Sequence, residues 1–443
     1  MKRRNFLALA GLGVAGASLA ACAGTGSTAG SGSEAKSKSE GGKVTELTWW
    51  SNHPGKSKDV ETELIKRFNE KNPDIKINLI DAGKNYEETA QKFNAALTGK
   101  DLPDIVVLSD VWWFNFAING QIAKVNEVAK KAGIDPSTYV PALYKDYELD
   151  GANYAFPFAR STPLFYYNKD VWAKAGLPDR GPETWAEMDE WGTKIQAVLD
   201  GKQKAHGWGN AVDYLAWTFE GPMWTMGGAY SDKWDLKFNT PETVKAVEWL
   251  KATVKGDKAY AGVSQKISAD FTAGLVASAI MSTGDLTGVK KDAKFEFGTA
   301  PLPNPKGDGG CPTGGAGLAI PSGISEDRQI AAAKFIDFIT NATNTAYWSR
   351  NVGYMPVRTT AQEDAEQKKF MEENPNFATA VKQLPQTRPQ DYARVFIPGA
   401  DTKIGGAFET ILNGNAEVQP EMDKLQKEVQ SIFDAQVRPR LKK

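Results

Sequence analysis

Aromatic side chains are abundant in this sequence, whereas imidazole and thiol groups are scarce. The 443 residues include 13 Trp and 13 Tyr but only 2 His and 2 Cys. Two imidazoles and two thiols leave almost nothing for a zinc site, a Cys/His catalytic pair or a disulfide framework. Aromatic rings fill the cores of soluble proteins, and they also form platforms for sugars and polyols. The residue types therefore predict no metal site and no cofactor.

Three polar side chains fall where an α/β protein places its ligand. Asp110 follows the continuous apolar run 104–108, and Tyr86 lies just after the alternating run 75–80. Ser161 stands between two prolines, in the run 156–163. Ligands of open parallel sheets sit beyond the carboxyl ends of the strands. The hydroxyls and the carboxylate are therefore candidates for hydrogen bonds to a polar ligand.

The elements that must position these residues alternate between strand and helix. Runs 46–50, 75–80 and 104–108 have strand patterns, and 60–68 and 86–97 between them have helical spacing. A strand that is apolar throughout, such as 104–108, is typical of a parallel sheet covered on both faces. The fold class is therefore α/β, and 443 residues are enough for two domains or lobes.

Proline-rich segments predict that the chain passes between the lobes three times. Pro157 and Pro163 exclude a central strand across 156–163, because proline lacks the amide that a ladder needs. Further crossings are expected at 297–305 and 351–357, and buried strands at 164–167, 275–281 and 314–320. The predicted lobes are 44–158 plus 303–352, and 163–298 plus 356–443.

The first 43 residues have the composition of an export signal and a tether. Residues 1–21 combine a basic start with an apolar stretch too short to span a bilayer, which predicts a signal peptide. Residues 19–22 resemble a bacterial lipobox, which implies lipidation of Cys22 and anchoring of an extracytoplasmic protein to the cell membrane. The plainer alternative is a signal peptide with an incidental Cys. Arg3 and Arg4 also resemble a twin-arginine signal, although general secretion stays open. Residues 22–43 carry no large apolar residue after the cysteine and predict a flexible tether.

The run 161–170 closely resembles the first crossing of the extracellular solute-binding proteins (family 1) of ABC importers. In particular it is similar to the members that bind sn-glycerol-3-phosphate and glycerophosphodiesters, and the resemblance extends from Trp49 to the C-terminus. It implies a two-lobed periplasmic-binding-protein fold of type II, like that of maltose-binding protein. It also implies a monomer that is not an enzyme, closes on a small molecule and docks on membrane permease subunits. The charges nearly cancel, 53 basic against 54 acidic residues, so nothing favours nucleic acid.

The resemblance also implies seven ligand-binding positions spread over both lobes. The family types are kept at six of them, and at the seventh an aspartate replaces the glutamate of the enterobacterial pattern. The positions are Tyr86, Asp110, Ser161, Ser282, Gly315, Tyr354 and Arg394.

These residue types suit a phosphorylated polyol. A phosphate monoester carries a charge between about −1.5 and −2 near neutral pH, and the planar fork of Arg394 can bind two of its oxygens. Asp110 would accept hydrogen bonds from glycerol hydroxyls, and its shorter side chain leaves the exact alcohol open. A larger ligand such as glycerophosphocholine would fit if Trp112, Trp113 or Trp208 faced the quaternary ammonium.

Each candidate residue also has a purely structural interpretation. Two alternative functions also stay open for the chain. Taken singly, the tyrosines can be core residues, the serines loop hydroxyls, Asp110 a helix cap and Arg394 a surface ion pair. The same fold can bind a sugar or oligosaccharide, with the aromatic segment 207–230 as the platform. A phosphoester hydrolase is a third possibility. It would need a mechanism built on carboxylates, because the sequence has no Gly-x-Ser-x-Gly elbow.

Overall fold

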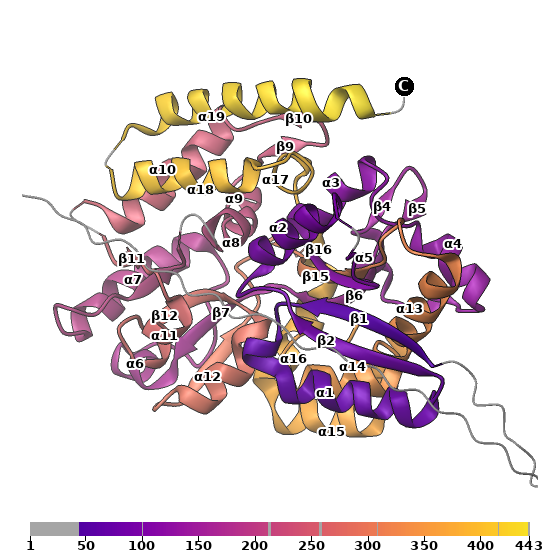
Figure 1. Cartoon of the computed structure of the whole chain (residues 1–443). Helices are drawn as coiled ribbons and strands as arrows, with labels where there is room; N and C mark the ends of the chain where they lie inside the picture. The colour runs from indigo at the N-terminus through magenta and orange to yellow at the C-terminus, as the bar shows by residue number, and fades with distance from the viewer. Residues whose placement is uncertain are drawn as a thin grey trace, which may run out of the picture. The chain divides into compact units, whose positions relative to one another are not determined.

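Two mixed five-stranded sheets form the centre of the structure, a computed structural model that describes residues 44–99, 101–210, 214–256, 259–307, 309–414 and 416–441 (Figure 1). The first sheet has the strand order β2 (Ile75–Asp81), β1 (Thr45–Ser51), β3 (Ile105–Ser109), β15 (Gly314–Ala319), β6 (Phe156–Ser161). The second has the order β11 (Ala261–Val263), β8 (His206–Trp208), β12 (Ser278–Ser282), β7 (Pro163–Asn168), β13 (Phe297–Ala300). The expected signal peptide, Cys22 and tether lie outside the described residues.

Both faces of the first sheet are covered by helices, as the apolar run at its centre predicts. Side chains of consecutive strand residues point to opposite faces. Val106 and Leu108 therefore pack on one side with Phe93, and Ile105 and Val107 pack on the other with the helices there. The helices that accompany this sheet are α1 (Pro54–Lys71), α2 (Tyr86–Ala96), α3 (Asp110–Ile118), α4 (Val125–Ala132), α5 (Pro141–Lys145), α13 (Glu326–Ile339) and α14 (Ala342–Val352).

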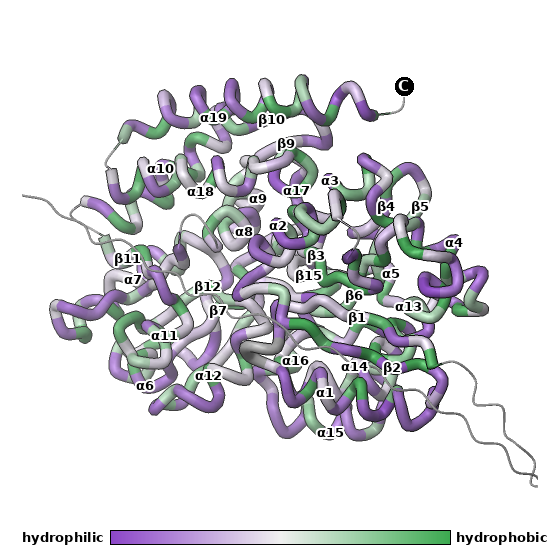
Figure 2. The backbone as a smooth tube through the Cα atoms, viewed as in Figure 1, coloured by the Kyte–Doolittle hydropathy of each residue, from purple (hydrophilic) through white to green (hydrophobic). Residues whose placement is uncertain are grey.

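The second sheet follows the same rule. Phe165 and Tyr167 of β7 pack on one side, and Leu164 and Tyr166 pack on the other. Its flanking helices are α6 (Lys169–Lys174), α7 (Trp185–Val198), α10 (Pro241–Val254), α11 (Ile267–Thr272), α12 (Leu286–Asp292) and α16 (Pro375–Gln383). Figure 2 shows hydrophobic residues in strands such as β1 and β6, and hydrophobic and hydrophilic residues interspersed along the helices.

The C-terminal part adds a helical layer, drawn in yellow in Figure 1. It contains α17 (Tyr392–Val395), α18 (Ala400–Leu412) and α19 (Val418–Ile432), which pack with α8 (Ala216–Thr218), α9 (Glu220–Thr225) and α10. The helix α15 (Ala365–Glu373) packs against α14 and α16. None of the helices among the described residues is long and apolar enough to cross a membrane.

The prolines of the first crossing lie where strands tolerate them. β6 is the edge strand of the first sheet, so Pro157 needs no ladder hydrogen bond on its outer side. Pro163 is the first residue of β7, and Thr162 alone separates the two strands. The expected crossing at 156–163 is thus a pair of strands belonging to different sheets. The Met355 amide donates to the Arg160 carbonyl at 2.8 Å, which brings the third expected crossing beside the first.

The strand expected at 275–281 begins three residues later than predicted. Leu275 is 48% exposed, and Val276 makes only an isolated bridge with Lys204. Regular pairing starts at Ser278, opposite Tyr167 of β7. The chain is still leaving a turn there, since Gly274 has φ +72°. Apolar residues therefore extend beyond the strand into the turn. The lobe boundaries proposed from the sequence stay predictions.

Candidate functional site

Two tyrosines from distant parts of the chain meet at the start of α2 and just after the end of α14. Asn85 caps α2 by accepting from the Glu88 amide at 2.9 Å, and this cap fixes Tyr86 at the first position of the helix. Tyr354 follows Gly353, whose φ of +105° ends α14. The two phenol oxygens lie 3.4 Å apart, and His53 Nε2 lies 3.4 Å from the oxygen of Tyr86.

Both tyrosines keep their protons at neutral pH. Burial raises the pKa of Tyr354 to about 12 and the pKa of Tyr86 well above its ordinary value. The charge of Asp110 also raises the pKa of Tyr86, so this carboxylate lies within electrostatic reach of Tyr86. The tyrosines can therefore donate hydrogen bonds to an anionic or hydroxyl-bearing ligand.

Ser282 lies at the end of β12 and next to Tyr354. Its hydroxyl accepts from the Gly284 amide at 3.0 Å, and its own amide donates to the Tyr214 hydroxyl at 2.5 Å. A Cβ on Gly284 would lie 2.9 Å from the Tyr354 ring and 3.3 Å from the Ser282 hydroxyl. The absence of that atom lets Tyr354 and Ser282 approach one another.

Gly315 and Ser161 lie on neighbouring strands of the first sheet. Gly315 has φ +106°, and a Cβ there would come within 2.0 Å of the Ala159 carbonyl oxygen. Only glycine fits this close approach. Ser161 is 2% exposed and pairs with Gly314. The space beside Gly314 is filled by the ring of Trp217, whose indole donates to the Thr313 carbonyl at 3.1 Å.

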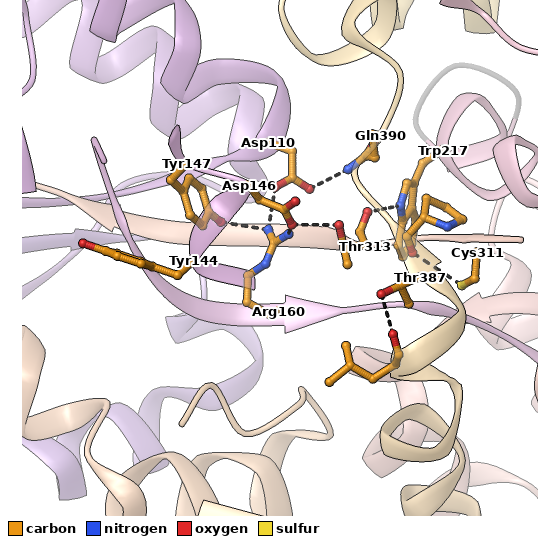
Figure 3. Close-up of polar contacts among 12 residues, drawn as sticks. Asp110, Tyr144, Asp146, Tyr147, Arg160, Trp217, Cys311, Thr313, Thr387 and Gln390 are labelled. Atoms are coloured by element: carbon orange, nitrogen blue, oxygen red, sulfur yellow. Dashed lines mark hydrogen bonds and ion pairs between the residues drawn. The ribbon is translucent and has the colours of Figure 1, made fainter. Parts of the chain in front are cut away.

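A buried arginine organises the acidic side of the site (Figure 3). The guanidinium of Arg160 donates to Asp110 Oδ1 at 2.5 Å, to the Tyr147 hydroxyl at 2.8 Å and to Asp146 Oδ2. Thr313 donates to the same Asp146 oxygen at 2.7 Å. Burial, together with the nearby charge of Asp110, raises the pKa of Asp146 to about 6, against the attraction of Arg160.

Arg394 lies at the other end of this network. Gln390 donates to Asp110 Oδ2 at 2.8 Å and accepts from the guanidinium of Arg394. Arg394 also forms an ion pair with Asp401, with Nε 2.7 Å from Oδ1. Loss of hydration alone would lower the pKa of Arg394. The carboxylates of Asp401 and Glu220 outweigh that effect, so the pKa lies above its ordinary value.

The structure thus arranges the seven expected residues in three groups. Tyr86, Tyr354 and Ser282 form a group of hydroxyls, and Ser161 and Gly315 lie on the paired strands β6 and β15. Asp110 and Arg394 are joined through Gln390. Both oxygens of Asp110 already have partners, so a ligand hydroxyl would share or displace them.

A cavity of about 610 Å³ opens beside Asp110. Asp110 lines it, and the other six expected residues do not. Of the expected tryptophans, Trp113 lines the cavity, whereas Trp112 donates to Glu87 at 3.0 Å and Trp208 is buried and donates to Thr253. The described residues contain no group of three or more His, Cys, Asp or Glu side chains placed to hold a metal ion.

Sequence reasoning missed Arg160, Asp146 and Gln390. A signal for Arg160 was present, because it is the one charged residue of the strand 156–161 and a buried arginine must be paired. Its partners Asp110 and Asp146 lie 50 and 14 positions earlier, which no local pattern connects. Gln390 had no sequence signal of this kind.

Comparisons with known proteins place the chain in one family. Residues 63–379 match the family described as bacterial extracellular solute-binding protein. The sn-glycerol-3-phosphate-binding periplasmic protein UgpB of Salmonella typhimurium is 31% identical over 401 residues, covering 86% of this chain and 90% of that protein. The corresponding Escherichia coli K12 protein is 30% identical over 400 residues, with the same coverage.

Solved structures agree with the sequence comparisons. The structure of UgpB from Mycobacterium tuberculosis in complex with glycerophosphocholine is 50% identical, with a TM-score of 0.86 over 89% of this chain and all of that one. Maltose-bound T. maritima MalE3 is 21% identical with a TM-score of 0.76, covering 88% of this chain and 100% of that one, which shows the shared fold. The predicted α/β fold of the maltose-binding-protein type is therefore confirmed. The chain belongs to the bacterial extracellular solute-binding proteins.

Proposed function

We propose that the chain is the substrate-binding subunit of an ABC importer and captures sn-glycerol-3-phosphate or a glycerophosphodiester. The observation that carries the proposal is the 50% identity, at a TM-score of 0.86, to a protein whose structure holds glycerophosphocholine. Relatives at 30–31% identity are named for binding sn-glycerol-3-phosphate. The chain would bind its ligand without turnover and deliver it to membrane permease subunits.

The geometry supports a phosphate ligand. Arg394 is a buried cation joined to Asp110 through Gln390, and a separate group holds two neutral phenols and a serine hydroxyl. A phosphate bound between these groups would find charge and several donors for its oxygens. Gly315 would add its backbone amide. A neutral sugar has no need of the buried arginine, so the sugar-binding alternative has less support. Maltose, included in the calorimetric titration described below, tests that alternative.

The proposed function includes attachment to the membrane. The lipobox-like residues 19–22 would place the lipid on Cys22, and 22–43 would tether the binding unit to the cell surface as a monomer. Metabolic labelling with a radioactive fatty acid tests this proposal. Label that persists in a Cys22→Ala variant would contradict it.

Calorimetric titration of residues 43–443 tests the ligand. These residues form one compact unit, and among the described residues its hydrophobic clusters extend from Leu47 to Leu441, so it is expected to fold without the leader. Glycerol-3-phosphate and glycerophosphocholine should bind, and maltose should not. Arg394→Ala should weaken binding by roughly thirtyfold or more, since truncating one partner of a buried charge pair costs about 2–5 kcal/mol.

Two further variants separate the role of Arg394 in binding from its role in folding. Arg394→Lys keeps a charge near Asp401 but loses the planar fork, so binding should weaken while the melting temperature changes less than in Arg394→Ala. Arg180→Ala removes a half-exposed arginine paired with Glu187 and should leave binding unchanged. Maltose binding that is indifferent to Arg394 would overturn the phosphate proposal. Hydrolysis of a chromogenic phosphodiester would show an enzyme instead.

A further inference from the structure

His53 lies next to the two site tyrosines, and its backbone is held from inside the protein. The residue is 4% exposed and caps the start of α1, two positions after the end of β1. Its amide donates to the Ser51 hydroxyl at 3.1 Å, and that hydroxyl donates to the buried carboxyl of Glu61 at 2.7 Å. A chain of hydrogen bonds in the core therefore fixes where the imidazole begins.

Four aromatic rings fix the plane of the imidazole. The ring centroids of Tyr86, Trp348 and Tyr354 each lie 5.7 Å from that of His53, and Phe158 lies 6.1 Å away. All four meet the imidazole edge to face, at interplanar angles between 71° and 89°. A ring enclosed in this way cannot turn freely, so Nε2 stays beside the Tyr86 oxygen, 3.4 Å away.

This group has fewer protons than hydrogen-bond contacts. Each tyrosine has one hydroxyl proton, and the Tyr86 oxygen faces both His53 Nε2 and the Tyr354 oxygen at 3.4 Å. If Nε2 lacks a proton, Tyr86 donates to it and has no proton left for a ligand. If Nε2 carries a proton, it donates to the Tyr86 oxygen, and both phenols can donate to ligand oxygens.

We propose that His53 is a positioning residue of the binding site: it donates from Nε2 to the Tyr86 oxygen and so directs the hydroxyl protons of Tyr86 and Tyr354 toward the ligand. The proposal rests on the function proposed above, because it needs both tyrosines to contact the bound ligand. It adds a residue outside the seven expected positions, and that residue acts through Tyr86 rather than by touching the ligand. The imidazole must then be protonated at Nε2 in the complex.

The chain provides an internal reference for the position of this proton. His206 is the only other histidine of the 443 residues, and burial lowers its pKa to about 3, so its ring is neutral. The Ser278 hydroxyl donates its one proton to the Ala205 carbonyl at 2.8 Å, so its oxygen accepts from His206 Nδ1, 2.8 Å away. His206 therefore carries its proton on Nδ1, whereas His53 is expected to carry a proton on Nε2.

Nitrogen-15 NMR of residues 43–443, labelled only at histidine, tests this assignment, because the two ring nitrogens of a histidine are distinct in each tautomer. With saturating glycerophosphocholine, the spectrum should contain one ring protonated at Nδ1 and one protonated at Nε2. His53→Gln should remove the second set of signals and so identify it. A His53 ring protonated at Nδ1 alone in the complex would overturn the proposal. A ring protonated at both nitrogens still donates from Nε2 and agrees with it.

Two substitutions separate the donor from the ring. His53→Phe keeps a ring among the aromatic neighbours but has no donor, so Tyr354 is left to donate to Tyr86 and the ligand loses one donor. Affinity for glycerophosphocholine and glycerol-3-phosphate should fall by about fivefold or more in calorimetric titrations. His53→Gln loses the ring but keeps an N–H in place of Nε2, so affinity should stay within about threefold of the parent while the melting temperature falls.

His206→Phe is the matched control, since it replaces the other buried histidine, on β8 of the second sheet, and should leave both affinities unchanged. A purely structural role of His53 reverses the order of the two variants, with His53→Phe close to the parent and His53→Gln the weaker binder. That order would overturn the positioning role and leave the proposed function intact. Failure of both phosphate ligands to bind the parent protein would overturn the proposed function as well.

Discussion

At the scale of single residues, several carboxylates are buried in this protein and must be neutral or paired. Glu61 on α1 is fully buried, and its Oε1 accepts from the Ser51 hydroxyl at 2.7 Å. Burial, together with the charge of Asp81, raises the pKa of Glu61 to about 8, despite that hydrogen bond. Ser51 also accepts from the His53 amide at 3.1 Å, so this carboxyl supports the loop that carries His53 beside Tyr86.

The raised pKa of Glu61 predicts that stability falls as the pH rises. Between about pH 4.5 and 8 the folded state holds a proton that the unfolded state has released. The free energy of unfolding therefore decreases by up to about 1.4 kcal/mol per pH unit from this group. Glu61→Gln keeps an acceptor for Ser51 and should flatten that slope in urea titrations at different pH.

The control for this prediction is Glu190→Gln, which neutralises an exposed carboxylate and should keep the slope of the parent protein. The prediction is wrong if the parent and Glu61→Gln are equally stable at pH 8 and their free energies of unfolding change equally with pH. Glu61 would then be ionised in the folded state at little cost in free energy.

At the scale of elements, the contact between β15 and β6 depends on one backbone conformation. Gly315 lies just before the point, between Ala316 and Gly317, where the pairing of the two strands becomes irregular. Its positive φ and the nearby Ala159 carbonyl leave no room for a side chain. Gly315→Ala should lower the free energy of unfolding by about 2 kcal/mol or more, as a strained backbone and a steric overlap combine.

Gly288 provides the comparison for Gly315. It lies inside α12 with open space at the position of a Cβ, so Gly288→Ala should leave stability unchanged or raise it by up to about 1 kcal/mol. Chemical denaturation of both variants measures the difference. A Gly315→Ala variant as stable as the parent would mean that the strand pair relaxes around the new methyl group.

Much of the element structure could be predicted from the sequence because it depends on local patterns. The apolar run 104–108 predicted β3, and the helical spacing of 86–97 predicted α2. The start of β12 was wrong by three residues, because hydrophobicity does not distinguish a strand from the apolar turn before it. The network of Arg160 was not predicted, because its partners become neighbours only when β6 pairs with β15 and lies near α3 and α5.

At the scale of the whole molecule, Gln390 connects the first sheet's helices to the C-terminal helical layer. It links Asp110, the first residue of α3 directly after β3, to Arg394 on α17. Family members of this fold close around their ligands by hinge motion. Opening that moves the C-terminal helical layer away from the first sheet would break the hydrogen bond between Gln390 and Asp110.

Gln390→Ala should therefore shift the ligand-free protein toward an open state. Small-angle X-ray scattering should give a larger radius of gyration for this variant than for the parent, and saturating glycerophosphocholine should remove the difference. Affinity should fall by about threefold to tenfold, the effect of losing a net hydrogen bond of about 0.5–1.5 kcal/mol. Identical radii without ligand would show that Gln390 does not hold the resting state closed.

The position of Cys311 has a practical consequence for observing such motion. Its thiol is 1% exposed and lies 3.7 Å from the Pro163 carbonyl, and burial raises its pKa well above the ordinary value. Thiol reagents attack the thiolate, which is absent here at neutral pH. Since Cys311 is the sole cysteine of residues 44–441, maleimide dyes should not label the native unit. A pair of engineered surface cysteines would carry fluorophores at two chosen points, and energy transfer between them would record opening and closing in single molecules.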